Sequence, residues 1–177
     1  DKRRLWATVF EGDEQDGLDA DVEAEALWRE CTDVSADHIV RLPAKDVFWE
    51  MGETGPCGPS SELHIYVGDD VEAQDPQGIV EGWDGYLELW NLVFIQFSRD
   101  EAGALHPLPD VHVDTGLGFE RICSVLQGAP SNYETDIFQP IIDRIAAVSG
   151  RADEAEDRVA MRVIADHIRA LTFAIAD

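Results

Sequence analysis

The stretch 111–127, VHVDTGLGFERICSVLQ, constrains the fold more than any other part of this sequence. Its alternating valines predict a strand, and the apolar residues that follow at helical spacing predict a helix. Between the two, Gly116 and Gly118 allow a tight turn and a close approach of the backbone to a ligand. Such a junction, with Arg121 in the first helical turn, can present N–H groups and a cation to a phosphate. The alternative is that Arg121 is an ordinary solvated helix residue.

The charge of the chain bears on its partners. There are 37 acidic and 13 basic residues, which gives a formal net charge of −24. Proteins that bind nucleic acid usually carry basic patches, so this composition argues against nucleic-acid binding at ordinary salt. One interpretation is simply a soluble acidic surface. We favour a second, an adaptation to very high salt, because the Debye length falls to roughly 3 Å at 1 M and repulsion from a polyanion is then screened as well.

The cysteines and the hydropathy indicate a compartment. Cys31, Cys57 and Cys123 are widely spaced and form no C-x-x-C pair. This pattern favours free thiols in a reducing cytoplasm. No apolar run approaches the length of a membrane span, and no signal peptide is recognisable, so we expect a cytoplasmic protein without a membrane partner.

Periodicity predicts an order of elements along the chain. Strands are expected over residues 5–10, 39–42, 62–67 and 86–97. Helices are expected over residues 21–31, 134–148 and 157–176. The glycine- and proline-rich segment 46–60 and the segment 68–85 are expected to be loops. The strand 86–97 is apolar enough to be buried on both faces for most of its length, and a domain boundary is expected near Ser131.

Two polar residues stand out in apolar strands. Asn91 is the only polar residue on one face of the strand 86–97, if side chains alternate with a period of two. A buried amide without partners costs about 1–3 kcal/mol, so Asn91 needs a partner from the protein or from a ligand. Asp114 raises the same question at the end of its own strand. If the two strands adjoin, the pair can hold a cationic amino group and its neighbouring carboxylate; the alternative is a structural hydrogen bond between strands.

Four segments together resemble one family. In chain order they are FWEMGETGPCGPSSE at 48–62, LELWNLVFIQF at 87–97, VDTGLGFER at 113–121 and RVIADHIR at 162–169. They resemble the alanyl-tRNA synthetases, which are class II aminoacyl-tRNA synthetases. The resemblance implies an α+β fold, with an antiparallel class II sheet, flanking helices and further helices after it. Residues 1–130 would be the second half of the aminoacylation core, including motif 3, and 131–177 the start of the helical tRNA-recognition domain.

The resemblance also implies an activity. It would be alanine–tRNA ligation: ATP, with Mg²⁺, activates L-alanine to alanyl-adenylate, and the alanyl group passes to tRNA(Ala). The family's motifs 1 and 2 precede the position that matches Asp1, so we expect these 177 residues alone to be inactive. One alternative is a truncated or paralogous synthetase-like domain that binds nucleotide or tRNA without catalysis. Another is an acidic interaction domain with no ligand pocket.

Site residues are carried over from matching motif positions. For ATP binding, the resemblance implies Trp49, Leu89, Trp90, Asn91, Gly116, Gly118 and Arg121. Arg121 would be the catalytic residue and would pair with a phosphate, while Leu89 and Trp90 would act through their backbone. For alanine binding, it implies Trp49, Asn91 and Asp114.

Three further residues concern tRNA and metal. Arg162 and Arg169 lie on one face of the last helix, where they either face tRNA or, by default, pair with the chain's own acids. Many family members have a second cysteine where Ser60 or Ser61 stands here. That difference argues against Cys57 as a metal ligand, and we expect no metal site in the protein itself.

Overall fold

The computed structural model describes residues 1–151 and 155–176. The packing of the chain separates two compact units, Asp1–Gly118 and Phe119–Asp177. The division falls earlier than the boundary near Ser131 that the sequence suggests, because the helix that follows Gly118 packs with the 3₁₀ turn at Asn132–Glu134 and so belongs to the second unit. The assignment of the two parts to an aminoacylation core and a tRNA-recognition domain stays a prediction.

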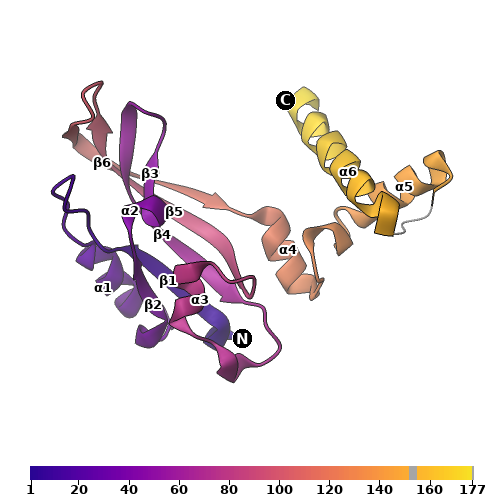
Figure 1. The fold of residues 1–177 in the computed structure, drawn as a ribbon, viewed down its shortest axis with the longest axis horizontal. Coiled ribbons are helices and arrows are strands. Elements are labelled where there is room, and N and C mark those ends of the chain that lie inside the picture. Colours follow the sequence, from indigo (N-terminus) through magenta and orange to yellow (C-terminus); the bar gives the residue numbers. More distant parts are fainter. Residues whose placement is uncertain (152–154, 177) are drawn as a thin grey trace. The chain divides into compact units, whose positions relative to one another are not determined.

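The first unit is built on a six-stranded sheet (Figure 1). Its strands are β1 (Leu5–Phe10), β2 (Ile39–Leu42), β3 (Phe48–Glu50), β4 (Gly55–Tyr66), β5 (Tyr86–Arg99) and β6 (Leu105–Leu117). The order is β2-β1-β4-β5-β6, with β3 also paired to β4. Only β1 and β2 run parallel, and every other pair is antiparallel. The α+β fold with a mostly antiparallel sheet, expected from the sequence, is confirmed.

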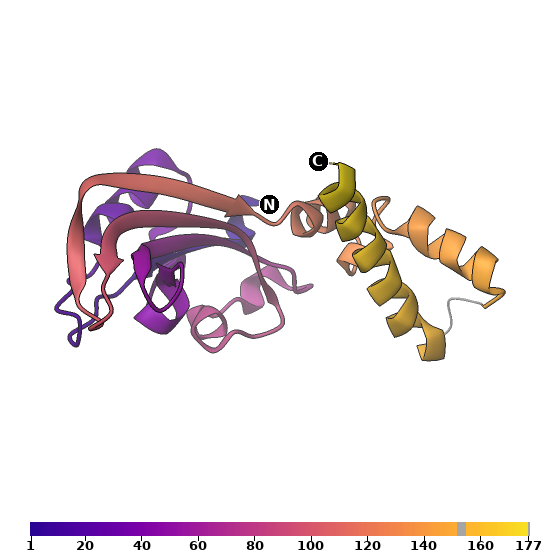
Figure 2. The same ribbon diagram turned by 90° about the horizontal axis from the view of Figure 1, so that it is seen from above.

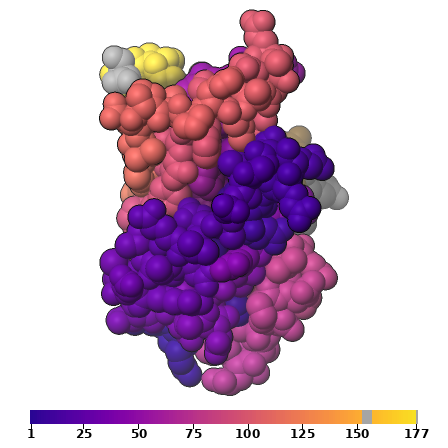
Figure 3. All heavy atoms as spheres, turned by 90° about the vertical axis from the view of Figure 1, so that its left-hand side faces the viewer, coloured from indigo at the N-terminus to yellow at the C-terminus, as the bar shows by residue number. Residues whose placement is uncertain are grey.

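Helices cover both faces of this sheet (Figure 2). The helices are α1 (Val22–Cys31), α2 (Ala44–Val47) and α3 (Pro76–Glu81), with short 3₁₀ turns at Lys2–Arg4, Ala36–His38 and Val71–Ala73. On one face, Trp6 and Phe10 of β1 form the core with Val47 of α2 and Ile79 of α3. On the other face, Trp28 of α1 donates a hydrogen bond to Ser61 Oγ at 2.7 Å. The space-filling view shows the indigo and purple N-terminal segments covering much of one side of this unit (Figure 3).

The segment 46–60 is not the loop that the sequence predicts. It forms β3 and the first half of β4, paired as a hairpin. Gly58 makes this possible, since a Cβ at that position would lie 1.9 Å from the carbonyl oxygen of Phe94 on β5. A shift in the β4–β5 register between Cys57 and Ser60 absorbs Pro59, which a regular central strand would exclude. Likewise α3 interrupts the loop predicted over 68–85.

The expectation that β5 is buried on both faces is wrong. Within β5 only Leu89 and Val93 are buried, and Trp90 is 39% exposed. The expected period of two is also broken, because a register shift leaves Leu89 without a partner on β4. Leu87 therefore faces the side opposite Asn91, although period two places them together.

The second unit is helical. It contains α4 (Phe119–Gln127), a 3₁₀ turn at Asn132–Glu134, α5 (Gln139–Ser149) and α6 (Ala155–Ala176). Phe138 and Ile142 pack with Met161 and Ala165 to form its core. The helix predicted from residue 134 begins later, at Gln139, because the 3₁₀ turn and its cap occupy the first residues.

Candidate functional site

A row of residues crosses four strands of the sheet on one face. The register pairs Thr8 of β1 with Glu62 of β4, Glu62 with Asn91 of β5, and Asn91 with Gly116 of β6. Directly paired residues of neighbouring strands project to the same side. Trp6 of β1 pairs with His64 of β4, two residues along from the Thr8–Glu62 pair, so Trp6 projects to the same face. The row therefore shares its face with the apolar core around Trp6.

Glu62 is the centre of a hydrogen-bond network in this row. Asn91 Nδ2 donates to Glu62 Oε1 at 3.4 Å, and His64 Nε2 lies 2.8 Å from Glu62 Oε2. The hydroxyl of Thr8 donates to Oε2 at 3.4 Å and accepts from the Glu62 backbone N–H at 3.0 Å. The Glu62 and His64 side chains are only 13% and 14% exposed. A carboxylate so nearly removed from water needs such partners, because an unpaired buried charge is costly.

Two polar atoms of this network have no partner. Among the residues that the structure describes, the buried side-chain atoms without a hydrogen bond are Asn91 Oδ1 and His64 Nδ1. A buried polar atom left in this state costs about 1–3 kcal/mol. The orientation of the Asn91 amide follows from its neighbour, because a carboxylate only accepts hydrogen bonds and so must face the NH₂ group. Asn91 Oδ1 is therefore a buried acceptor that no donor of the described residues occupies.

Asp114 lies beside this acceptor. It pairs with Val93, two residues along β5 from Asn91, so both side chains project from the same face of adjacent strands. This confirms that the two residues lie on adjacent strands with their side chains on one face, and a shared amino-acid site stays a prediction. Asp114 is exposed, and its Oδ1 accepts a hydrogen bond from the Thr115 backbone N–H at 2.9 Å.

The glycines of the junction act differently from the expectation. Gly116 lies inside β6, neither Gly116 nor Gly118 has a positive φ, and the strand runs into α4 without a tight turn. The Gly118 N–H donates to the carbonyl of Leu89 at 2.9 Å, which ties the end of β6 to the irregular point of β5. A Cβ on Gly116 would meet nothing within 4 Å, so there is open space directly beside Asn91. Trp90 projects from the opposite face with Leu63, which leaves only its backbone near this space.

Trp49 and Arg121 are the two further side chains proposed for ATP. Trp49 of β3 pairs with Gly58, farther along β4 than the Glu62 row. Arg121 lies in α4 of the second unit, half-buried, and its carbonyl accepts from Ser124 Oγ at 2.8 Å. The register thus brings Asn91, Asp114 and Gly116 together and does not bring Trp49 into their row. Cys57 pairs with Glu50 on the same hairpin, and burial raises the pKa of its thiol.

The two arginines proposed for tRNA are paired with acids of their own unit. Arg162 contacts Glu134 at 2.7 Å, and Arg169 forms an ion pair with Glu120. Arg169 also lies 5.2 Å from the centre of the Phe173 ring. Their side chains are 27% and 23% exposed. These pairs are the default that the sequence left open, and a role in tRNA contact stays a prediction.

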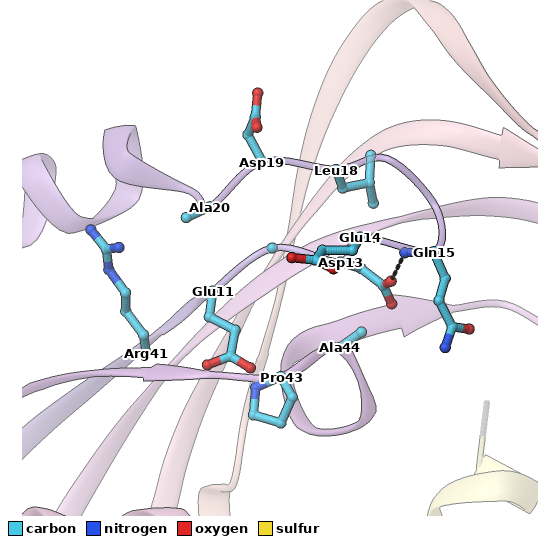
Figure 4. A pocket seen from close by; sticks show the side chains of 11 residues that line it. Glu11, Asp13, Glu14, Gln15, Leu18, Asp19, Ala20, Arg41, Pro43 and Ala44 are labelled. Atoms are coloured by element: carbon cyan, nitrogen blue, oxygen red, sulfur yellow. Dashed lines mark hydrogen bonds between the residues drawn. The ribbon is translucent and has the colours of Figure 1, made fainter.

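A hollow of about 780 Å³ lies away from this row, between the β1–α1 loop and the segment after β2 (Figure 4). Acids dominate its lining, namely Glu11, Asp13, Glu14 and Asp19. The one cation there, Arg41, is bound to Glu25 at 2.6 Å. Such a lining repels phosphate groups, so this hollow does not suit ATP.

The family model for tRNA synthetases class II (A) matches residues 1–177. The chain belongs to this family. It is 50% identical to an alanine–tRNA ligase of Chlorobium phaeobacteroides over 99% of this chain and 19% of that protein. It is 50% identical to one of Parabacteroides distasonis over 98% of this chain and 20% of that protein. It is 49% identical to a mitochondrial alanine–tRNA ligase of Saccharomyces cerevisiae over 99% of this chain and 18% of that protein.

This class II synthetase chain spans about a fifth of the length of the curated relatives it matches. Within residues 1–151 and 155–176, no helix is both long and apolar enough to cross a membrane.

Glu62 and His64 are not among the site residues predicted from the sequence. The sequence pattern could have indicated them, because a period of two places both on one face of a predicted strand, with Ser61 and Leu63 on the other face. Two ionisable residues on a strand face that packs against a core indicate a buried polar network. Thr8 could not have been assigned to it without the β1–β4 register.

Proposed function

We propose that the protein carrying this chain is an alanine–tRNA ligase. It would activate L-alanine with ATP and transfer the alanyl group to tRNA(Ala). The observation that carries the proposal is the partnerless acceptor Asn91 Oδ1 beside the carboxylate of Asp114 on one sheet face. Membership of the class II (A) synthetases and relatives named alanine–tRNA ligase support it.

The chemistry assigns a role to each group. The ammonium of alanine donates to Asn91 Oδ1 and pairs with Asp114, which leaves its carboxylate directed away from the strand pair. A carboxylate oxygen then attacks the α-phosphorus of ATP, the bond from that phosphorus to the β-bridging oxygen breaks, and pyrophosphate leaves. Arg121 neutralises charge on a phosphate, and the open space at Gly116 admits the nucleotide. Trp49, Leu89, Trp90 and Gly118 are the further candidates for nucleotide contacts.

Mg²⁺ is expected to accompany ATP. In nucleotide sites this ion is bound by one or two carboxylates together with phosphates and water. On the face that carries Asn91, the register places Glu88 opposite His64 and Asp114 opposite Val93, so carboxylates for that role are present. The ion would supply charge neutralisation at the phosphates.

Partners and compartment follow from the same proposal. tRNA is the second substrate, and Arg162 and Arg169 remain the candidates for contacting it once their ion pairs with Glu134 and Glu120 open. High salt would weaken the repulsion between tRNA and a chain of net charge −24. The cytoplasm is the proposed location, although one relative is named as mitochondrial.

Amino-acid-dependent exchange of pyrophosphate into ATP tests the proposal. The native protein, with whatever flanking sequence its gene encodes, is assayed in molar KCl with alanine, glycine or serine. We expect exchange that depends on alanine, with a kcat/KM for alanine above those for the other two. The absence of alanine-dependent exchange, in a preparation shown to be folded by its melting curve, would refute the proposed activity.

A further inference from the structure

We infer that Glu62 is a positioning residue for the amino-acid substrate: it fixes the Asn91 amide so that Oδ1 faces the substrate's ammonium. This inference rests on the proposed function and names the group that sets the polarity of its amino-acid site. Glu62 would not touch the substrate itself. It would act through the hydrogen bond from Asn91 Nδ2 to Glu62 Oε1.

The need for such a group comes from the symmetry of an amide. A primary amide presents an oxygen on one side and an NH₂ group on the other, and the two differ little in shape. If the amide turned over, Asn91 would present its NH₂ group to a cation and would repel it. The carboxylate of Glu62 removes that choice, because it has no proton to donate and can face only the NH₂ group.

Glu62 is itself held on its other side. His64 Nε2 lies 2.8 Å from Oε2, and the Thr8 hydroxyl lies 3.4 Å from the same oxygen. These contacts occupy Oε2 and leave Oε1 for Asn91. Across three strands, Thr8 thus helps to fix the Glu62 carboxylate, and that carboxylate fixes the Asn91 amide.

A purely structural account does not explain the row. The net benefit of a buried polar network depends on satisfying every member, and a half-satisfied network is costly. Here the network leaves Asn91 Oδ1 buried and without a partner. The unpaired atom lies next to the open space at Gly116, which is where a ligand can complete it.

The test is Glu62→Gln in the native protein, measured by pyrophosphate exchange. Glutamine keeps the size of glutamate but can donate as well as accept, so the Asn91 amide is free to turn over. We expect the KM for alanine to rise about tenfold, equivalent to about 1.4 kcal/mol, while the KM for ATP changes less than twofold. Glu72→Gln is the matched control, because that side chain is 83% exposed, and it should leave both constants unchanged.

A second variant covers the case in which Glu62→Gln fails to fold. Glu62→Asp keeps the charge but withdraws the carboxylate by one methylene from a contact already at 3.4 Å, so it should raise the alanine KM in the same selective way. Unchanged constants, or equal increases for alanine and ATP, would overturn the role of Glu62. A wild-type protein without alanine-dependent exchange would instead refute the proposed function, so the two failures are distinguishable.

Discussion

Asn91 and Glu62 face each other across the β4–β5 pair, with the amide nitrogen of Asn91 3.4 Å from the carboxylate of Glu62. The sequence left two interpretations of Asn91 open, a structural hydrogen bond or a ligand contact. The structure shows the first of these, because the amide nitrogen donates to Glu62 of the neighbouring strand, while the buried amide oxygen is left without a partner and a ligand contact there stays a prediction. The proposed amino-acid site would use the oxygen of a side chain whose nitrogen is already fixed to the sheet.

Replacing the carboxylate beside this oxygen should weaken the use of the amino acid selectively. For Asp114→Asn we expect kcat/KM for alanine to fall about 10- to 100-fold, because a hydrogen bond to a charged group contributes about 1.5–3 kcal/mol. The side chain is exposed, so the melting temperature should change little. Exchange kinetics at varied alanine and saturating ATP measure the effect. A loss confined to ATP would contradict the assignment of Asp114 to alanine.

Arg121→Ala should reduce the use of ATP by more than tenfold. The guanidinium is assigned to a phosphate, and removing one charged contact from a developing phosphate charge typically costs about 10²–10³ in rate. Arg121 lies in the first turns of α4 and outside the apolar core of its unit, so the variant should melt close to the wild type. Exchange at varied ATP and a thermal melt test both statements. Wild-type ATP kinetics would contradict the assignment of Arg121 to a phosphate.

Gly58→Ala should destabilise the first unit strongly. The added methyl would lie 1.9 Å from the Phe94 carbonyl oxygen, so β4 and β5 must separate or shift. Overpacking of this kind costs about 1–3 kcal/mol or more. Gly116→Ala is the control for stability, because nothing lies within 4 Å of its Cβ position. Denaturant unfolding compares the two variants, and equal midpoints would mean that the close approach at Gly58 is not required.

The chain should be more stable in molar KCl than in dilute buffer. Its 37 acidic residues against 13 basic ones repel one another in the compact state, and salt screens that repulsion. Exposed ion pairs such as Lys2–Asp33, Arg3–Asp1 and Lys45–Asp46 oppose this trend only weakly, because surface pairs contribute about 0–1 kcal/mol each. Thermal melts at low and molar KCl provide the test. A melting temperature that does not rise with KCl would rule out the repulsion argument.

Local patterns were enough to predict several elements. The structure confirms the strands Leu5–Phe10 and Ile39–Leu42 and the helix Val22–Cys31. Each has the residue pattern and composition typical of its type, and the helix also has a capping residue. Asp21, for example, caps α1 by accepting a hydrogen bond from the Ala24 N–H at 2.9 Å. These elements depend mainly on neighbours in sequence.

The features that the sequence did not predict correctly share a different cause. The hairpin of β3 and β4 contains Gly58 and Pro59, residues typical of loops, and only its pairing with β5 makes it a strand. The facing of Leu87 depends on an irregularity between two strands. The role of Glu62 depends on which residues of β1 and β5 lie opposite it. Pairing between distant segments decides all three cases, and a single sequence does not encode it locally.

The unpaired Leu89 also limits how the length of β5 can vary. Glu88 pairs with His64, and Asn91 pairs with Glu62, so both β5 residues project to the same face of the sheet. They do so although they are three positions apart, because Leu89 between them is unpaired. Removing the codon for Leu89 would leave Glu88 and Asn91 two positions apart, which a regular strand places on the same face, so Asn91 would stay on the face of Asp114 and Tyr86 in the core that it shares with Trp6. Removing Leu92 instead, between the regularly paired Asn91 and Val93, would turn one of these two residues to the other face. Single-codon deletions should therefore be tolerated at Leu89 and in the β5–β6 turn around Gly103, and not between Asn91 and Val93.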